Sequence, residues 1–389
     1  MKKMSNLSLS CLELFAGAGG LAKGLEMAKI KHKALIELDY NACLTLANNY
    51  NHQLIYNVDV RKFKFEEVGE VDIIAGGPPC QPFSLGGKHK GHMDQRDMFP
   101  YACKAISICK PKAFIFENVK GMLRPAFSNY FEYLILSLTY PEVSLKDLQF
   151  WEEHLIVLKT IDNSNNYPGV KYNVVFGLLN AANYGIPQRR ERVFIVGIRQ
   201  DLNINWSFPQ PSHSYDSLLW SQFVSYDYWE RHQIKPISIE WVDQRTKQKI
   251  NQLIQKPTLF PPVLKPWKTI RDQIGELPQP DSQGSFDQEH ILRQGARSYP
   301  GHNGSYIDMP SKTIKAGDHG VPGGENMIRY PDETVRYYTI LELEAKRIQT
   351  FPDNYRFIGC WTESMRQIGN AVPVELGYFL ASSLSKALC

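Results

Sequence analysis

The sequence predicts a doubly wound α/β fold, in which helices cover both faces of a mostly parallel sheet, together with a second, smaller, irregular and β-containing domain. Up to about residue 200, short continuous apolar runs alternate with helical patterns, which is typical of parallel strands buried on both faces. Beyond residue 200 the chain becomes rich in tryptophan and proline and loses its regular patterns. Its 389 residues also exceed the size at which one core usually keeps growing, so two domains are expected.

Six apolar runs are the predicted strands of the sheet. They cover residues 9–15, 33–38, 71–77, 112–118, 172–179 and 192–198. The first run leads into the glycine-rich turn AGAGG and then into a helix with Leu21, Leu25 and Ala28 on one face. Apolar residues at helical spacing return near the C-terminal end, at Val374, Leu376, Phe379, Leu380 and Leu384. We expect this last helix to pack back on the first domain, so that the first domain comprises 1–200 completed by 365–389.

The second domain is expected over residues 201–364. Five tryptophans lie between residues 206 and 267 of this stretch, and we expect them to form its core rather than to stack on bases.

The composition is that of an ordinary soluble protein, with 43% apolar and 22% charged residues. Because the net charge is only +4, any surface that binds nucleic acid must be local, and residues 181–200 carry four arginines against a single acid. Seven cysteines form no C-x-x-C pair and no metal-binding spacing with histidine. Their odd number argues against a disulfide framework and for a reducing compartment. No apolar run is long enough to span a bilayer, and the first ten residues lack the core of a signal peptide.

The segment LELFAGAGG, residues 12–20, is predicted to form a strand, a tight turn and a helix start. Gly17, Gly19 and Gly20 allow close approach of a ligand to the backbone. Glu37 ends the next strand, at the spacing expected of an acid that binds a ribose hydroxyl. The pattern is more compact than the loop of dinucleotide-binding proteins, so it suits a ligand with a carboxylate and no pyrophosphate, such as S-adenosylmethionine. A purely structural glycine turn is the alternative interpretation.

Cys80 follows Pro78 and Pro79 at the end of the apolar run 71–77. Open α/β sheets place their ligand sites at this carboxyl edge, and the prolines fix φ on the approach to the thiol. A lone cysteine is more often buried and inert. However, Glu117 ends another predicted strand at the same edge. A thiol and a carboxyl group that meet there indicate covalent catalysis with acid assistance.

Five motifs between residues 12 and 373 resemble, in order and approximate spacing, those of the cytosine-5 DNA methyltransferases of the bacterial modification-enzyme type. They are FAGAGG, GGPPCQPFS, ENV, QRRER and GNAVP. The resemblance implies the S-adenosylmethionine-dependent methyltransferase fold, with a cofactor and catalytic domain, a target-recognition domain and a DNA cleft between them. The activity it implies is methyl transfer from S-adenosylmethionine to carbon 5 of a cytosine flipped out of a specific duplex sequence, leaving S-adenosylhomocysteine.

The resemblance assigns the chemistry to four residues. Cys80 would attack carbon 6 of cytosine, which converts the ring into an enamine whose carbon 5 can take the methyl group. A free thiol with a pKa of ~8.5 is only a few per cent ionised at neutral pH, so electropositive surroundings must activate it. Glu117 would donate a proton or hydrogen bond to ring nitrogen 3. Arg192 would bind oxygen 2 and the neighbouring phosphate, and Arg190 would support it. Without the other motifs, QRRER would be interpreted as a solvated charged turn.

The resemblance also assigns contacts with the cofactor. Phe15 would lie against its adenine or sulfonium side, and Gly17 and Gly19 along its methionine part. Further implied contacts are Glu37 to the ribose, Asp59 to the adenine amino group, and Pro79 and Asn370 as walls of the pocket.

A thiol at a sheet edge cannot reach carbon 6 of a stacked base, so the cytosine must leave the duplex. Residues 84–99 carry glycines and cations and are expected to close over it, although a surface loop without function is the alternative. Arg96 matches an arginine of the family, and a Thr313–Ile314 pair resembles a dipeptide of its recognition domains. The expected DNA contacts are Ser84, Lys88, Arg96, Lys312, Thr313 and Lys315. Arg293, Arg297 and Tyr299 are further candidates for reading bases.

One segment departs from the family pattern. In residues 336–353 the spacing between Thr339 and Gln349 is two residues longer than usual, and Leu343 stands where an arginine is usual. We expect this change to affect the scaffold between the domains rather than the chemistry.

Three rival interpretations remain. A tRNA cytosine methyltransferase would carry a Cys-Phe-Thr tripeptide, which is absent here. A non-enzymatic DNA-binding relative would not need Cys80, Glu117 and Arg192, and a nicotinamide dehydrogenase would leave Pro-Pro-Cys without a role. We therefore expect a monomeric, metal-free, cytoplasmic and nucleoid-associated enzyme that acts on double-stranded DNA and contacts no membrane. A cognate restriction endonuclease would act on the same site without forming a stable complex with it.

Overall fold

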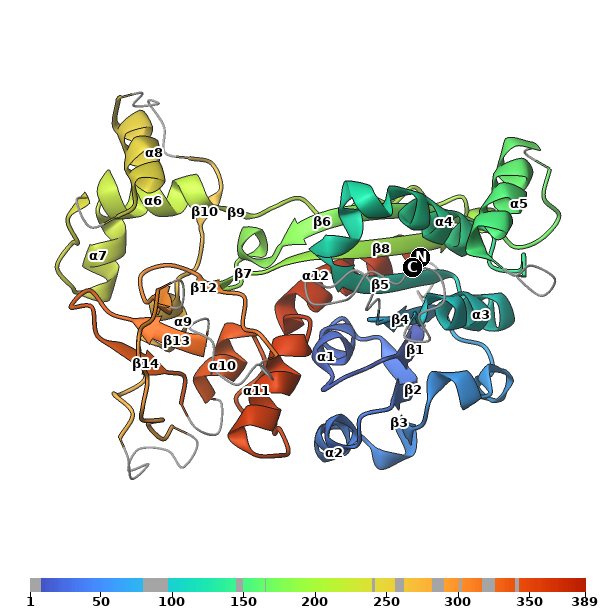
Figure 1. Ribbon diagram of the computed structural model, residues 1–389, viewed down its shortest axis with the longest axis horizontal. Coiled ribbons are helices and arrows are strands. Elements are labelled where there is room, and N and C mark those ends of the chain that lie inside the picture. The colour runs from blue at the N-terminus through green and yellow to red at the C-terminus, as the bar shows by residue number, and fades with distance from the viewer. Residues whose placement is uncertain are drawn as a thin grey trace, which may run out of the picture.

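A seven-stranded sheet in the order β3-β2-β1-β4-β5-β8-β6 forms the centre of the first half of the chain (Figure 1). The computed structural model describes residues 8–79, 97–144, 150–164, 166–239, 242–255, 262–281, 290–300, 303–316, 326–339 and 343–389. The strands are β1 (Ser10–Leu14), β2 (Lys31–Glu37), β3 (Ile55–Asn57), β4 (Ile73–Gly76), β5 (Ala113–Val119), β6 (Tyr172–Asn180) and β8 (Glu191–Arg199). All six predicted strands are therefore present, and the short β3 is added at one edge.

The sheet is mostly parallel, as predicted. Strands β1 to β5 pair in parallel, whereas β8 runs antiparallel to both of its neighbours, β5 and β6. The expectation that the run 192–198 is a parallel strand is thus wrong. The chain returns from β6 through one 3₁₀ turn (Ala181–Tyr184) and the two-residue β7 (Gln188–Arg189), without the long crossover that a parallel strand requires.

Helices pack on both faces of the sheet, and alternate residues of each strand point to opposite faces. They are α1 (Gly20–Met27), α2 (Tyr40–Asn49), α3 (Phe99–Cys109), α4 (Ser128–Thr139) and α12 (Val374–Leu388), while α5 (Trp151–Ser164) packs on α4. On one face, Phe114 and Phe116 of β5 are buried with residues of α3 and α4. On the other face, Ala113 and Ile115 are buried with residues of α1 and α12. This arrangement is the doubly wound core that the sequence predicts.

Helix α12 packs against α1, far away in the sequence. Leu376, Leu380 and Leu384 are buried in the same cluster as Leu21 and Leu25. The two backbones approach so closely that a Cβ atom on Gly24 would lie 2.7 Å from the carbonyl oxygen of Val374. The C-terminal segment therefore completes the core of the first half.

The second half of the chain combines short helices with two- and three-residue strands, and lies to the left in Figure 1. The helices are α6 (Tyr215–Phe223), α7 (Asp227–His232), α8 (Gln244–Gln255), α9 (Ile270–Ile274), α10 (Leu343–Ile348) and α11 (Trp361–Asn370). The strands are β9 (His213–Ser214), β10 (Lys265–Pro266), β11 (Ser305–Tyr306), β12 (Ser311–Lys312), β13 (Met327–Arg329) and β14 (Val335–Tyr337). The sequence predicts irregular, β-containing structure here but not these helices. In α8, for example, only Thr246 and Ile250 are buried, and glutamine and lysine fill most of the other positions.

Trp229 and Trp267 pack within the second half, as expected, whereas Trp206 packs against the core of the first half and Trp241 lies outside the described residues. Trp229 is 1% exposed and shares a cluster with Leu218 and Tyr228. Trp206 and Trp267 are half-buried, and each donates a side-chain hydrogen bond to the first half or to α12. None of the helices in the described ranges has both the length and the apolar character needed to cross a membrane.

Strands β7 and β12 join the two halves. They pair in parallel, with Ser311 opposite Gln188 and Lys312 opposite Arg189. We call this pair the β7–β12 bridge.

Candidate active site

A cavity of about 430 Å³ opens at the carboxyl edge of the sheet, where β1, β2, β4 and β5 end. Ligand sites of open α/β sheets lie at this edge, and its volume is in the range of small-molecule sites. Its lining includes the predicted residues Phe15, Gly17, Glu37, Pro79, Glu117, Arg192 and Asn370. The chain segments that the sequence analysis singled out therefore meet in one place.

The glycine-rich turn after β1 has φ angles that residues other than glycine rarely adopt. Gly17 and Gly19 have φ values of 54° and 83°, and Phe15 adopts 55° although it is not glycine. Such a φ is uncommon for an aromatic residue and is typical of functional sites. A Cβ atom on Gly20 would lie 2.3 Å from the carbonyl oxygen of Val372, so this glycine lets the turn approach the segment before α12. Gly19 itself does not line the cavity.

Glu37 is held by the backbone of the loops that surround it. Its carboxylate accepts hydrogen bonds from the backbone N–H groups of Gly17 (2.7 Å), Leu38 (2.8 Å) and Asp39 (2.8 Å). Burial raises the pKa of Glu37, and these three N–H groups counteract the rise. The acid is thus fixed beside the glycine turn, at the end of β2.

Glu117 and Arg192 form an ion pair inside the cavity. Arg192 Nε lies 2.7 Å from Glu117 Oε1, and the two side chains are 16% and 12% exposed, Arg192 first. The pairing of β5 with β8 explains the contact. Val119 lies opposite Arg192, so Glu117 is the diagonal neighbour of Arg192 on the same face. Because β8 is antiparallel, its first residues lie at the same sheet edge as the last residues of β5.

Asn118 fixes the segment that follows β4. It is buried, and its Nδ2 donates to the carbonyl oxygen of Pro78 at 2.9 Å. A Cβ atom on Gly77 would lie 3.5 Å from Glu117 Oε2, an ordinary contact distance, so this segment lies beside the acid. Pro79 is the last described residue before a gap and lines the cavity. Cys80 is the next residue in the chain and lies outside the described residues.

Arg190 is fully buried between the two halves of the chain. Its guanidinium donates to the carbonyl oxygens of Ile314 and Asn370, each at 3.4 Å, and its Nε has no acceptor among the described residues. Burial, together with the neighbouring charge of Arg192, lowers the pKa of Arg190 well below its ordinary value. Since a guanidinium keeps its charge in proteins, this cation is held at a considerable electrostatic cost. Arg190 therefore ties the segment 311–316 to the end of α11 instead of lining the cavity.

A chain of buried amides runs beside Arg190. Gln188 accepts from the N–H of Ile314 (3.3 Å) and donates to Gln349 Oε1 (3.0 Å). Gln349 in turn donates to the carbonyl oxygens of Ile368 (2.6 Å) and Ala371 (3.2 Å). The segment 336–353 therefore supports the scaffold around the cavity.

The other predicted site residues either lie away from the cavity or fall outside the described residues. Asp59 does not line the cavity. Its carboxylate accepts hydrogen bonds from the backbone N–H and the Nε of Arg61, both at 2.9 Å. Thr313 donates its hydroxyl to the carbonyl oxygen of Arg189 (2.9 Å), Lys312 lines a different cavity, and Lys315 is exposed. Ser84, Lys88 and Arg96 lie outside the described residues, as does Cys80.

Of the three candidate base readers, Arg293 contacts an aromatic ring. Its guanidinium lies 4.0 Å from the centre of the Trp361 ring, which stabilises the cation by a cation–π contact. Arg297 and Tyr299 are exposed.

Several residues of the cavity were missed by the sequence analysis. Glu13 is buried and bonded to His32 (3.1 Å), and Asp39 forms an ion pair with Arg366 (2.8 Å). Glu13 and Asn118 stand inside motifs already recognised, LELFAGAGG and ENV, so their positions at strand ends were available as a signal. Arg366 belongs to a helix far along the chain, and no local pattern indicates its contact with Asp39.

Comparison with known proteins agrees with this geometry. The family model described as C-5 cytosine-specific DNA methylase matches residues 9–140 and 152–386. The Type II methyltransferase M.NgoMIV of Neisseria gonorrhoeae is 27% identical over 385 residues, which cover 98% of this chain and 99% of that protein. M.PspPI of Psychrobacter sp. (strain TA137), also a Type II methyltransferase, is 30% identical over 384 residues, or 98% and 80% of the two chains.

Solved structures share the fold. A putative DNA modification methyltransferase encoded within an E. coli prophage superposes with a TM-score of 0.57 at 20% identity, over 98% of this chain and 99% of that one. The S. pombe Dnmt2 methyltransferase gives 0.56 at 17% identity, with the same coverage. At this level of identity the likeness concerns the fold alone. The family model, however, spans nearly the whole chain, and the cavity brings Glu117 and Arg192 together beside the glycine turn. The chain therefore belongs to the C-5 cytosine-specific DNA methylase family and is a DNA (cytosine-5-)-methyltransferase.

Proposed function

We propose that this enzyme methylates carbon 5 of a cytosine that is flipped out of duplex DNA, through a covalent adduct with Cys80, using S-adenosylmethionine. One observation carries the proposal. The Glu117–Arg192 pair lines the same cavity as the glycine turn, and the described chain reaches this cavity at Pro79, one residue before Cys80. A carboxyl group, a guanidinium and the segment that leads to a thiol are the groups that addition to a pyrimidine requires.

The cavity suits S-adenosylmethionine as the cofactor. A Cβ atom added to Gly17, in the same turn as Phe15, would meet no described atom within 4 Å, so open space adjoins the turn. Glu37 is fixed where a ribose hydroxyl can donate to it, while Pro79 and Asn370 supply walls. When bound, S-adenosylmethionine supplies a methyl group that is activated by its sulfonium. Asp59 is the least supported contact because its carboxylate is engaged with Arg61.

In the proposed first step, the thiolate of Cys80 adds to carbon 6 of the cytosine. The new S–C6 bond shifts electrons to carbon 5, which would then bond to the methyl carbon as the methyl–sulfur bond breaks and S-adenosylhomocysteine leaves. The addition also places negative charge on nitrogen 3 and oxygen 2. Loss of the carbon 5 proton to a base at the site and departure of the Cys80 thiolate then restore the double bond between carbons 5 and 6.

The proposed roles of Glu117 and Arg192 require them to separate from each other. Arg192 is to bind oxygen 2 of the base, and Glu117 is to donate to nitrogen 3, which it can do only after taking up a proton. In the structure, Arg192 Nε is bonded to Glu117 instead. We infer that the entering base replaces this ion pair, so that each partner turns to one edge of the pyrimidine. The two side chains are largely buried, and hydrogen bonds to charged groups contribute more here than they would in water.

Residues 201–364 are proposed to recognise the DNA target, and residues 1–200 with 365–389 to carry out the chemistry. Flipping costs a few kcal/mol, which contacts with the extruded base and with the phosphates must offset. Ser84, Lys88, Arg96, Lys312, Thr313 and Lys315 remain the candidates for these contacts. Since the relatives are named Type II methyltransferases, we propose that the enzyme protects host DNA in a restriction-modification system. It would act as a monomer on DNA in the cytoplasm, with a cognate restriction endonuclease that does not bind it stably.

A mechanism-based trap tests the proposal directly. In a duplex that contains 5-fluorocytosine in place of cytosine, carbon 5 carries fluorine, which cannot leave as a cation. The Cys80 adduct therefore cannot eliminate, and protein and DNA should stay covalently joined after denaturation. Peptide mapping should locate the bond at Cys80, and the adduct should form only when S-adenosylmethionine is present. A complex joined through another residue, or no complex alongside normal methyl transfer to ordinary DNA, would overturn the covalent mechanism.

Cys80→Ala supplies the matched control. Because the thiol is proposed to act on the base and not to anchor the cofactor, this variant should lose methyl transfer and keep nearly the wild-type affinity for S-adenosylmethionine in calorimetry. Loss of cofactor binding in a folded Cys80→Ala protein would contradict the assigned role.

A further inference from the structure

A second cavity, of about 790 Å³, lies in the second half of the chain and is separate from the candidate active site. One wall comes from α6 and the start of α8, through Tyr215, Leu219, Phe223 and Thr246. The opposite wall comes from the segments around β11, β12 and β13. Arg189 of the β7–β12 bridge and Lys312 complete the rim. We call it the recognition cavity.

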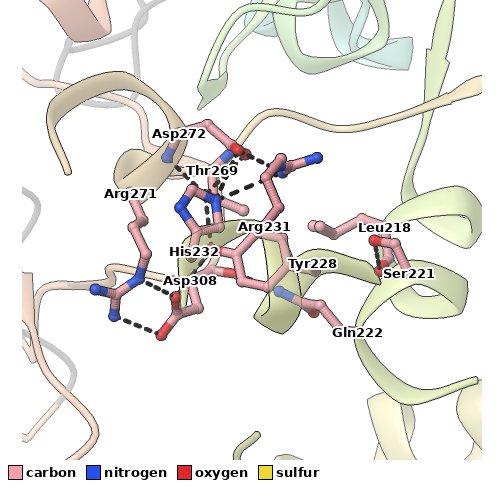
Figure 2. A network of polar contacts seen from close by, with 10 residues as sticks. All are labelled: Leu218, Ser221, Gln222, Tyr228, Arg231, His232, Thr269, Arg271, Asp272 and Asp308. Carbon is pink, nitrogen blue, oxygen red and sulfur yellow. Dashed lines mark hydrogen bonds and ion pairs between the residues drawn. The ribbon is translucent and has the colours of Figure 1, made fainter. Parts of the chain in front are cut away.

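A polar network holds the two walls at a fixed separation, and Figure 2 shows Asp308 close to Arg271 and Tyr228. The Asp308 carboxylate accepts from Arg271 Nε (2.6 Å) and from the Tyr228 hydroxyl (2.9 Å). Its backbone carbonyl accepts from Gln222 Nε2 of α6 at 2.7 Å. Asp308 and Gln222 both line the recognition cavity and are buried. Charged hydrogen bonds of this kind tie three helices and a loop together.

The network continues on the side away from the cavity. Thr269 and Asp272 form a capping box at the start of α9, and the Tyr228 hydroxyl is 2.9 Å from Thr269 Oγ1 (Figure 2). His232 of α7 lies 2.9 Å from the Asp272 carboxylate. Helices α6, α7 and α9 are therefore locked to one another, and the cavity is preformed.

Most of the acids that line the recognition cavity are already engaged. The charge of Asp308 is balanced by Arg271, and Glu333 forms an ion pair with Arg329. Asp243 accepts from the N–H (3.1 Å) and the hydroxyl (2.7 Å) of Thr246, at the start of α8. Asp308 and Glu333 are thus each paired with an arginine, whereas Asp243 is bonded to the neutral groups of Thr246.

The rim carries two cations in register. Lys312 lies opposite Arg189 across the β7–β12 bridge, and both line the recognition cavity. The N–H of Arg190 donates to the carbonyl oxygen of Gln188 at 3.1 Å, a three-residue turn that exposes Arg189 at its tip. Within the described residues, no carboxylate forms an ion pair with Arg189. Asn303 Oδ1 accepts from Lys312 Nζ at 3.1 Å and so orients the ammonium group.

Like charges placed opposite each other on neighbouring strands repel. The nearest acid in sequence, Glu191, is paired with Lys120 at 2.8 Å and is not in the recognition cavity. A phosphate beside Arg189 and Lys312 would interact favourably with both charges. Guanidinium and ammonium groups both bind phosphate well, the first as a fork and the second as a point charge.

We propose that Arg189 and Lys312 form a clamp for two neighbouring phosphates of the DNA backbone at the rim of the recognition cavity. The inference rests on the proposed function and adds to it a residue, Arg189, that stands at the variable position of the Q-x-R-x-R pattern. Three arginines of one short segment would then have three different roles. Arg189 lines the recognition cavity, Arg190 is buried between the halves, and Arg192 lines the active-site cavity. The clamp would fix the duplex relative to the flipped cytosine without reading any base.

Salt dependence of DNA binding tests the clamp. The probe is a mixed-sequence duplex of about 30 base pairs, titrated in fluorescence anisotropy between about 50 and 200 mM KCl with S-adenosylhomocysteine present. The slope of log K against log salt is about −0.9 per neutralised phosphate. Arg189→Ala and Lys312→Ala should each make the slope less negative by about 0.9, and the double variant by about 1.8. Lys64→Ala, which removes an exposed cation in the first half, should leave the slope unchanged.

Each outcome decides a different claim. If wild-type protein binds the duplex and the double variant keeps its slope, the clamp is wrong while the proposed function stands. A loss of affinity that is confined to one sequence, with the slope unchanged, would mean that Arg189 reads a base, and this also overturns the clamp. If the wild-type protein binds no duplex and transfers no methyl group, the proposed function itself fails. Unchanged affinity for S-adenosylmethionine in both variants confirms that they are folded.

Discussion

The amide chain between Gln188 and Gln349 allows a quantitative test of how the two halves are held together. Gln349 is 0% exposed and connects Gln188 with the carbonyl oxygens of Ile368 and Ala371. Gln349→Leu keeps nearly the same volume but removes all three hydrogen bonds. The substitution therefore isolates the polar contribution from the packing contribution.

The expected loss follows from counting the groups that would remain unpaired. Ile368 O keeps a partner, because the N–H of Ala371 donates to it at 3.2 Å. Gln188 Nε2 and Ala371 O would lose their partners among the described residues. Each buried unsatisfied group costs about 1–3 kcal/mol, so we expect the free energy of unfolding to fall by about 3 kcal/mol. That corresponds to roughly a hundredfold change in the equilibrium constant.

Urea unfolding monitored by tryptophan fluorescence measures this change. Gln53→Leu is the matched control, since Gln53 is exposed and the chemical change is the same. The double variant Gln188→Leu/Gln349→Leu should be more stable than the sum of the two single effects predicts, because each single substitution already removes the partner of the other. The reasoning is refuted if Gln349→Leu stays within about 0.5 kcal/mol of wild type, the range of an ordinary surface substitution, or if the two effects simply add.

Two further predictions concern stability. Gly24→Ala should lower the free energy of unfolding by about 1–3 kcal/mol, because its Cβ would lie 2.7 Å from Val374 O and push α12 off α1; urea unfolding checks this, and a stable variant would show that the helices can separate without cost. Burial by itself raises the pKa of Glu344, but the hydrogen bonds and charges of Arg336 and His290 hold that pKa below its ordinary value. Glu344 therefore stabilises the fold above the unfolded-state value of 4.5, and this contribution is lost as the pH falls below it. Glu344→Gln should cost about 3 kcal/mol at neutral pH and make the acid-side loss of stability shallower, and an unchanged pH profile of unfolding would contradict the assignment.

The sheet and the position of the site could be predicted because they depend on local patterns. Apolar runs locate strands, and the carboxyl ends of parallel strands share one edge, so the sequence alone was enough to place Glu37 and Glu117 together. The direction of a strand is different. The run 192–198 is equally apolar in either direction, and only its short connection from β6 makes it antiparallel.

Asp59 shows how a local partner can compete with a role that a motif implies. An acid just after a strand is a reasonable partner for an adenine amino group. Two residues later, however, Arg61 offers both a backbone N–H and a guanidinium, and Asp59 accepts from both. Aspartate commonly bonds to backbone groups two residues ahead. The sequence shows the competing Arg61. It does not show how strongly Asp59 binds Arg61 compared with a cofactor.

The segment QRRER shows most clearly what a sequence motif leaves open. Its arginines are chemically identical, yet one lines the recognition cavity, one is buried against the carbonyl oxygens of Ile314 and Asn370, and one is paired with Glu117. Those partners come from segments up to 180 residues away, so no local sequence rule could assign a separate role to each arginine. A buried guanidinium without a carboxylate partner is costly, and the structure keeps it where three segments meet beside the site. Substitution of Arg190 should therefore change the shape of both the recognition cavity and the active-site cavity. Substitution of Arg189 should lower only the affinity for DNA.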